Sequence, residues 1–385
     1  MALLDLWKNN KEQLASKHIQ QVIAFAGDGK LGDGSSSSLE LREYLMTIPS
    51  ELLAKYADQC LVDAFTNSGF ALQDIVNEIG HRIGFNVTPG RYRGSTSQPG
   101  HDGIWTDVGG HKIVLEVKTT DAFTIKLNTI AEYRQELIKQ GKMLLGGSSM
   151  LLVVGRQDTG DVEAQIRGSR HAWDMRMISV EALLRMVRLK EDVEDPSIIK
   201  RIHEILIPKE FTRLDQIVNI AFAAVEDVKQ EEAEEDHAEG DGDQNQTPAA
   251  FHAQCISRIE KALGTSLVRQ SRASFSSPDG AVRLLCLVSK FHEVPKRYWF
   301  SFHPHQDESL GSSLTAYIAF GCGSPEKLFV LPYKDFKPWL ENFNKTENPK
   351  GYYWHVKIRE SEKSFEMVGK PGTKNFAISK YLLKA

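Results

Sequence analysis

The sequence has few cysteines and no long hydrophobic run. Its cysteines, Cys60, Cys255, Cys286 and Cys322, are widely scattered, with no CxxC pair for zinc and no dense pattern for disulfides. We therefore expect each to be a small buried apolar residue. No segment approaches the roughly 18 uninterrupted apolar residues of a membrane-spanning helix. The first residues also lack the basic region and cleavage site of a signal peptide, so we expect a cytoplasmic protein without a membrane partner.

An overall positive charge is also missing, since the formal net charge of the 385 residues is −4. Residues 226–243, however, contain ten acidic side chains and one lysine, which gives this short run a charge of −9. Because the whole chain carries −4, the remainder carries about +5. The negative total is therefore no argument against a nucleic-acid partner.

The chain is long enough for two or three domains of roughly 100–200 residues each. Residues 1–69 show apolar side chains three and four apart, which predicts a helical N-terminal segment of two or three helices. Residues 226–248 combine like charges with almost no apolar content, as in a flexible linker. Beyond them, residues 249–385 contain one helical pattern and several strand-like runs. We expect a separate α+β domain there, for recognition or sensing.

Residues 70–225 alternate between helical and strand-like patterns. A helix is predicted over FALQDIVNEIGHRIGF, followed by a loop rich in Gly, Arg and Ser. Two β-like runs, HDGIWTDV and KIVLEVKTT, flank the pair Gly109-Gly110, which is a strong signal for a hairpin turn. A helix near residues 128–140, a strand at 150–155 and a strand–helix pair in WDMRMISVEALLRMVRLK follow, with trailing helices. This order predicts an α/β domain whose mixed sheet is flanked by helices.

The predicted hairpin carries the pattern with the clearest chemistry. Asp102 lies on its first arm, and Glu116 and Lys118 lie two apart on its second arm, so these two point to the same face. Two carboxylates can hold Mg²⁺, which prefers oxygen ligands, and the backbone carbonyl of Val117 is a further candidate ligand. The alternative is an exposed strand with an alternating salt bridge. We favour a metal site in which an ammonium stands beside two acids.

The stretch from FALQDIVNEIGHRIGF through PGHDGIW and IVLEVKTT to WDMRMISV resembles the restriction-endonuclease-like, PD-(D/E)XK nuclease superfamily. The resemblance covers about residues 70–188 and implies that Asp102 and Glu116 bind Mg²⁺, for which Mn²⁺ can substitute. It implies that Lys118 positions or activates the attacking water. The family's Pro-Asp pair is opened here into Pro99-Gly100-His101-Asp102. A further metal-binding acid on the first helix is common in one branch, for which Glu78 is the candidate, with a solvated helical acid as the alternative.

Several basic residues are candidates for contacts with phosphate. Arg91 and Arg93 lie in the loop before the first acid, and His101 is its neighbour. Arg167 and Arg170 follow the apolar strand on what we predict to be a small basic loop. For each of these residues, a plain surface or loop-shaping role is the alternative.

The C-terminal region has no catalytic triad and no metal-ligand spacing, but it is rich in aromatic residues. Alternating aromatic side chains in strands usually belong to a core. The functional alternative is a pocket or platform for a small molecule or a modified base, formed by Trp299, Phe302, Trp354 and His355.

Three functions compete on these patterns. The first is a Mg²⁺-dependent DNA endonuclease used in restriction or phage defence, with target or activator recognition in the C-terminal domain. The second is a junction resolvase or repair nuclease that recognises DNA shape. The third is a binding protein without catalysis on a nuclease fold, which would have no need of the Glu116–Lys118 pattern. We favour the first, and expect a homodimer because a double-strand cut needs two active sites.

Overall fold

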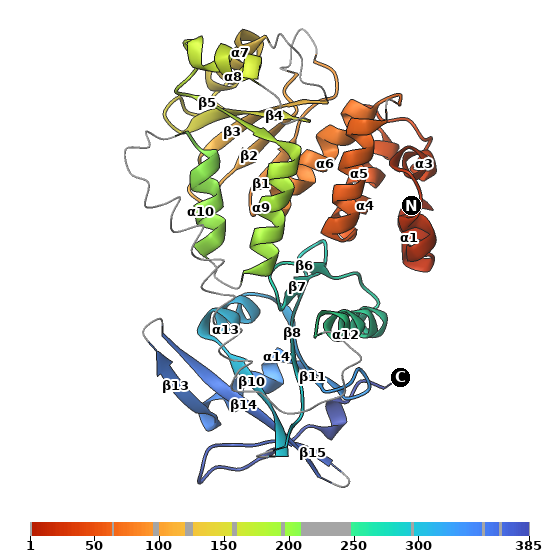
Figure 1. Ribbon diagram of the computed structural model, residues 1–385, viewed down its shortest axis with the longest axis vertical. Coiled ribbons are helices and arrows are strands. Elements are labelled where there is room, and N and C mark those ends of the chain that lie inside the picture. Colours follow the sequence, from red (N-terminus) through yellow and green to blue (C-terminus); the bar gives the residue numbers. More distant parts are fainter. Residues whose placement is uncertain are drawn as a thin grey trace. The chain divides into compact units, whose positions relative to one another are not determined.

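The computed structural model divides the chain into two compact units, residues 1–225 and 226–385. Their described residues form a mixed α/β structure with three sheets (Figure 1). The description covers residues 2–63, 65–94, 100–119, 126–155, 160–193, 197–208, 248–293, 296–348, 351–361 and 364–384. The predicted linker, residues 226–248, lies outside the described residues except for Pro248. Among the described helices, none is long and apolar enough to cross a membrane.

The first unit begins with helices, as predicted, but with more of them than the two or three expected. They are α1 (Ala2–Asn9), α2 (Lys11–Ala15), α3 (Ile19–Phe25), α4 (Ser36–Thr47) and α5 (Ser50–Val62). Ser35 caps α4 by accepting a hydrogen bond from the Ser38 backbone N–H at 3.2 Å. The regularly spaced apolar residues of these helices are buried in the same core as the sheet of the first unit. The N-terminal segment and the sheet are therefore packed as one body.

The sheet of the first unit has the order β1-β2-β3-β4-β5. Strands β1 to β3 are antiparallel neighbours, whereas β3, β4 and β5 run parallel, so the sheet is mixed as predicted. The elements are α6 (Ser68–Arg82), β1 (Asn86–Pro89), β2 (Gly103–Thr106), β3 (Lys112–Lys118), α7 (Leu127–Lys139), β4 (Ser148–Val154), α8 (Gly160–Gly168), β5 (Met175–Ser179), α9 (Val180–Asp192) and α10 (Ser197–Leu206).

Helices cover both faces of this sheet (Figure 1). Alternation along β3 sends Ile113 and Leu115 into the core shared with α6 and α9, and sends Val114 to the opposite face, where it packs with α7. Strand β4 is buried along its whole length, as expected for a parallel strand covered on both sides. The face covered by α7 is the one that carries the candidate site.

Two predictions for this unit were wrong in detail. Strand β1 lies where we expected only a loop, because its four residues end in Pro89 and give too short a pattern to recognise at the edge of the sheet. The predicted basic loop after β4 is α8 as far as Gly168, with Val162 and Ile166 one turn apart and buried, so Arg167 is helical whereas Arg170 lies in the turn that follows.

The described part of the second unit, from residue 248, consists of α12 (Pro248–Leu263) followed by two sheets. The five-stranded sheet has the order β12-β11-β8-β7-β6 and the six-stranded sheet has the order β16-β15-β14-β10-β9, with β13 also paired to β14. Strands of the five-stranded sheet are β6 (Val268–Arg269), β7 (Ser274–Ser276), β8 (Val282–Ser289), β11 (Thr315–Cys322) and β12 (Leu328–Pro332). Strands of the six-stranded sheet are β9 (His292–Glu293), β10 (Lys296–Phe302), β13 (Asn344–Asn348), β14 (Gly351–Ser361), β15 (Ser364–Met367) and β16 (Phe376–Ala377).

Aromatic side chains fill the core between these two sheets. Phe300 of β10 meets Phe320 of β11 with ring centroids 5.0 Å apart, and Phe329 of β12 meets Phe365 of β15 at 4.8 Å. The remaining elements are α13 (Pro304–Gly311), α14 (Tyr333–Phe336), and the 3₁₀ helices η1 (Lys337–Asn342) and η2 (Ser379–Tyr381). All four cysteines of the chain are buried free thiols, which confirms the expectation from the sequence.

Candidate active site

The hairpin of β2 and β3 brings Asp102 and Glu116 together. Gly103 is paired with Leu115, and the Asp102 backbone N–H donates to the Leu115 carbonyl at 3.0 Å, so Asp102 lies across from Glu116. The turn between the strands is closed by Gly110, which has a φ of 84° and donates to the Asp107 carbonyl at 3.1 Å. This confirms the predicted hairpin.

Hydrogen bonds fix one oxygen of each acid. The Val117 backbone N–H donates to Asp102 Oδ2 at 2.6 Å. Lys118 Nζ donates to Glu116 Oε1 at 2.5 Å, from a side chain that is 39% exposed. The carbonyls of Leu115 and Val117 point to the same side, because they are two residues apart on one strand. Since the Leu115 carbonyl bonds to Asp102, the Val117 carbonyl is also directed to the side where Asp102 lies.

The other oxygens of the two acids lack partners among the described residues. Glu116 Oε2 is buried without a hydrogen bond, and no hydrogen bond reaches Asp102 Oδ1. Burial, followed by the charge of Glu116, raises the pKa of Asp102 to about 7, against the opposing effects of the Val117 N–H and Lys118. Two acids facing each other in this way carry negative charge that the described protein groups only partly balance.

The charge on Lys118 is set by the same pair of acids. Burial alone would lower the pKa of its ammonium group, but the charge and hydrogen bond of Glu116, together with Asp102, outweigh burial and raise that pKa. Lys118 is therefore protonated at neutral pH and acts as a hydrogen-bond donor and a positive charge.

The arrangement fits a hard divalent cation. Mg²⁺ is commonly bound through one or two carboxylates while water and substrate complete its shell. Asp102 and Glu116 supply two such groups, and a cation would satisfy the buried Glu116 Oε2. The described residues provide no cluster of three or more His, Cys, Asp or Glu side chains suited to a metal ion. Any metal at this site would thus rest on two carboxylates and the Val117 carbonyl.

Glu78 does not join these acids, so the structure gives no support to its predicted role as a metal ligand. Its carboxylate accepts from Arg82 Nε at 2.9 Å, one turn along α6, and both side chains are buried. Arg82 also donates to the carbonyls of Leu45 and Ile48 at 2.9 and 2.8 Å. Glu78 therefore neutralises a buried arginine that ties α6 to the end of α4.

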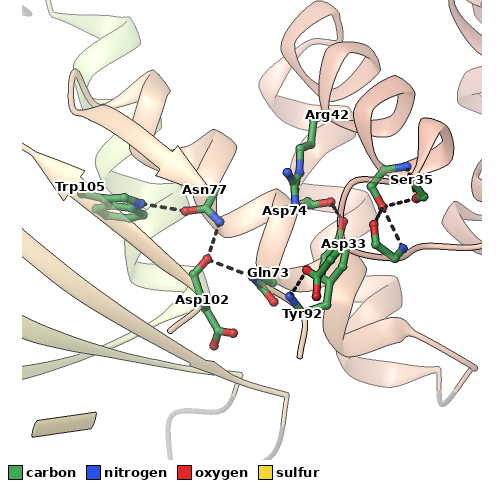
Figure 2. Close-up of polar contacts among 11 residues, drawn as sticks. Asp33, Ser35, Arg42, Gln73, Asp74, Asn77, Tyr92, Asp102 and Trp105 are labelled. Carbon is green, nitrogen blue, oxygen red and sulfur yellow. Dashed lines mark hydrogen bonds and ion pairs between the residues drawn. The ribbon is translucent and has the colours of Figure 1, made fainter. Parts of the chain in front are cut away.

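Helix α6 instead supports the site through amides that the sequence analysis missed. Gln73 Nε2 and Asn77 Nδ2 donate to the Asp102 carbonyl at 3.0 and 2.9 Å, and Trp105 Nε1 donates to Asn77 Oδ1 at 3.2 Å. Figure 2 shows the Asp102 carboxylate pointing away from these two amides. A Cβ at Gly103 would overlap Asn77 Oδ1, so glycine is required for this close approach. The helix thus holds the backbone of Asp102 and leaves its carboxylate free for chemistry.

The same helix contacts the N-terminal segment through Asp74 (Figure 2). Arg42 Nε lies 2.8 Å from Asp74 Oδ1, and the Tyr92 hydroxyl donates to Asp74 Oδ2. Burial raises the pKa of Asp74 to about 6, although Arg42 and Tyr92 oppose the shift. The Tyr92 backbone N–H donates to Asp33 Oδ1 at 2.8 Å, and its ring stacks on Phe70 at 4.5 Å. Tyr92 thereby anchors the basic loop to the first five helices.

The predicted phosphate-binding residues differ in solvent exposure, in charge and in the partners that their side chains already have. Arg93 is exposed, whereas Arg91 is 43% exposed and lies 3.5 Å from Asp33. Burial, followed by the charge of Lys142, lowers the pKa of His101 to about 4, so at neutral pH it offers no positive charge to a phosphate. Arg167 pairs with Glu163 along α8, and Arg170 Nε lies 3.3 Å from His171 Nε2. Of this set, Arg93 is the best placed for a phosphate.

Tyr133 on α7 is a further neighbour of the acids that the sequence analysis missed. Burial, followed by the charge of Glu116, raises the pKa of its hydroxyl. A Cβ added at Gly100 would lie 3.4 Å from Tyr133 Oη, which places this hydroxyl beside the loop that enters β2. The signal in the sequence is weak, because one tyrosine on an amphipathic helix is usually a packing residue.

The four aromatic candidates of the second unit do not share one pocket. Phe302 is fully buried and Trp354 is 6% exposed, and both belong to the core between the sheets. Trp299 and His355 are half-buried and lie on the opposite face of the six-stranded sheet. The alternation of a strand explains this split, because positions 299 and 302 differ by an odd number and 354 and 355 are adjacent.

No protein-family model, curated protein or solved structure matches this chain.

Proposed function

We propose that this chain is a Mg²⁺-dependent endonuclease that hydrolyses DNA phosphodiester bonds in restriction or phage defence. The proposal includes a restriction-endonuclease-like domain at about residues 70–188 within the mixed sheet of the first unit. The observation that carries it is the pair of facing acids on one hairpin, with buried Glu116 Oε2 unpartnered and a protonated lysine beside them. Most buried carboxylate oxygens in proteins have a hydrogen-bond partner, so an unpartnered one beside a second acid favours a cation site over a structural ion pair.

Asp102, Glu116 and the Val117 carbonyl would hold Mg²⁺, which supplies Lewis-acid polarisation of the phosphate and a bound water of lowered pKa. The chain's own groups position the reactants around it. Gln73 and Asn77 hold the Asp102 backbone, which fixes the point from which its carboxylate reaches towards Glu116. Glu116 directs the Lys118 ammonium, which donates to the attacking water or to a phosphate oxygen. Because its pKa is raised, Lys118 orients and stabilises charge at neutral pH and does not accept the proton.

The experiment that tests this proposal is cleavage of plasmid, phage and modified DNAs by the full chain, with Mg²⁺, Mn²⁺ or EDTA. Cleavage is expected with either metal and not with EDTA. Glu116→Gln and Lys118→Ala should each lower the rate by roughly a hundredfold or more, while DNA binding in EDTA changes little. Glu136→Gln and Lys139→Ala, which alter exposed residues on α7, are the matched controls.

The outcome of this series separates the alternatives. Cleavage that survives both Glu116→Gln and Lys118→Ala would rule out the proposed site. Binding without cleavage in any metal would favour a binding protein on this fold. Faster cutting of branched DNA than of linear duplex, with no preference among linear sequences, would instead identify a junction-specific enzyme.

A further inference from the structure

One face of the six-stranded sheet in the second unit carries a row of aromatic and basic side chains. Alternation along β10 and β14 sends Tyr298, Phe300, Phe302, Trp354, Val356 and Ile358 into the core. The opposite face therefore carries Arg297, Trp299, Ser301, Tyr353, His355, Lys357 and Arg359, which we call the outer face. The register pairs Trp299 with Lys357 and Ser301 with His355, so the cations lie towards the Arg297 end of the outer face and the rings towards its Tyr353 end.

The rings of the outer face are held in place by polar contacts. Trp299 Nε1 donates to His355 Nδ1 at 3.0 Å, so the proton of the neutral imidazole lies on Nε2, which is 2.6 Å from Thr346 Oγ1. Trp299 and Tyr353 meet edge to face with centroids 6.4 Å apart. The ring of His303 lies 5.5 Å from that of Tyr353. These rings are half-buried and their orientation is fixed before any partner arrives.

The cations of the outer face differ in whether they have an acidic partner. Arg359 pairs with Glu366 at 3.2 Å across to β15. Within the described part of the chain, neither Arg297 nor Lys357 has an acidic partner. Burial, and then the charge of Arg297, lowers the pKa of Lys357, which indicates that the two cations lie close together. Two like charges on a half-buried surface repel each other, and an anion bound between them would relieve that repulsion.

We propose that the outer face binds single-stranded DNA, with unpaired bases stacked on Trp299 and Tyr353 and phosphates held by Arg297 and Lys357. A group of aromatic rings beside a group of cations suits a single strand, which offers unpaired bases for stacking and phosphates for ion pairs. A sheet face with exposed rings is a recurrent platform for unpaired bases. Duplex DNA is a poorer fit, because its bases are already stacked on one another and only its phosphates would be engaged.

This binding does not depend on the proposed nuclease chemistry, since the outer face lies in the second unit and uses none of the three core residues of the first. It can therefore be measured in EDTA with the full chain, and its failure would leave the cleavage test untouched. Likewise, Glu116→Gln should abolish cleavage without changing the binding of single-stranded DNA by the outer face.

The test is fluorescence anisotropy of a labelled DNA strand of about 12 nucleotides, within the range that one such surface covers. The same sequence is compared as a duplex, as RNA and as an abasic strand with equal charge. Wild-type protein should bind the DNA strand more tightly than the abasic strand, and the duplex measures binding that does not come from the outer face. Trp299→Ala should weaken binding to the DNA strand about tenfold and have little further effect on the abasic strand, whereas Trp299→Phe should retain most of it.

Lys357→Ala tests the phosphate contacts separately. It should lower the slope of log affinity against log salt concentration by about 0.7. Lys334→Ala is the matched control, because Lys334 is an exposed lysine on α14 and should leave affinity and slope unchanged. Circular dichroism of each variant checks that it is folded, and Lys357→Ala carries the test if Trp299→Ala does not fold.

Three results would overturn the proposal. One is unchanged binding of the DNA strand by folded Trp299→Ala or by Lys357→Ala. Another is equal affinity for the abasic strand, which would reduce the outer face to a general site for polyanions. The third is an equal or larger loss of affinity for the duplex or for RNA than for the DNA strand in Trp299→Ala.

Discussion

Replacing Gly103 with alanine would test whether α6 holds the strand that follows Asp102 by close contact. The added Cβ would overlap Asn77 Oδ1 and lie 3.2 Å from Asn77 Cγ, so either the amide or the strand must move. The amide is held at both ends, by the Asp102 carbonyl and by Trp105 Nε1, so it has little freedom to yield. We expect a cost of about 1–3 kcal/mol, as for other overpacked sites.

The magnitude can be read from the melting temperature of the first unit. For a unit of this size, 1–3 kcal/mol corresponds to a drop of roughly 2–12 °C. Cleavage should fall as well, because moving β2 moves the Asp102 carboxylate relative to Glu116. Asn77→Ala alone should also destabilise the protein, since it leaves the buried Trp105 Nε1 without its acceptor.

The double variant Asn77→Ala/Gly103→Ala is decisive, because Asn77→Ala removes the oxygen atom that the added Cβ would overlap. In the Asn77→Ala background, Gly103→Ala should cost much less than in the wild-type protein, which gives a coupling of about 1 kcal/mol or more. Differential scanning calorimetry of the four proteins in EDTA measures it. Equal drops in melting temperature in the two backgrounds would refute the claim that this contact positions the strand.

Three further predictions concern charge. First, Mg²⁺ or Ca²⁺ at a hundred times its dissociation constant should stabilise the wild-type protein by about 2.7 kcal/mol, and Asp102→Asn or Glu116→Gln should abolish the shift in melting temperature. Second, the folded-state pKa of Asp102 lies near 7, above its ordinary value of 3.8, so its ionisation destabilises the metal-free fold between about pH 4 and 7. Asp102→Asn should thus raise the melting temperature in EDTA at pH 8 more than at pH 4, and a rise that is the same at both values would contradict the shift. Third, Arg42→Ala should destabilise the protein by about 3–5 kcal/mol, because it leaves the fully buried Asp74 without its cation, and adding Asp74→Asn should recover much of that loss in a denaturant titration.

The hairpin of β2 and β3 is the part of the fold that the sequence predicted best, because its pattern is compatible with only one local structure. The pair Gly109-Gly110 between two β-like runs allowed only a tight hairpin, and that hairpin alone places Asp102 opposite Glu116. The number of N-terminal helices was harder, because α1, α2 and α3 have eight residues or fewer and are stabilised by a shared core.

The support around the site could not be predicted, because it depends on contacts between elements far apart in the sequence. Glu78 and Asn77 are adjacent on α6, and nothing local indicates that Asn77 meets Asp102 while Glu78 meets Arg82. One clue was present, since Gln73, Asn77 and Gly80 are spaced four and three apart and share one helical face. Polar and small residues at such positions indicate that a helix approaches a neighbouring backbone closely.

The contacts that α6 makes on its two sides have a practical consequence for anyone wishing to isolate or transplant the region that carries the candidate site. Truncation near residue 70 would respect the boundary that the nuclease-like pattern suggests, but it would remove Asp33 and Arg42 from their contacts with Tyr92 and Asp74. It would also expose the large apolar surface that the first five helices share with the sheet. The smallest module that can be moved to another protein with its hairpin intact therefore includes the N-terminal helices, which are part of the core that supports the hairpin.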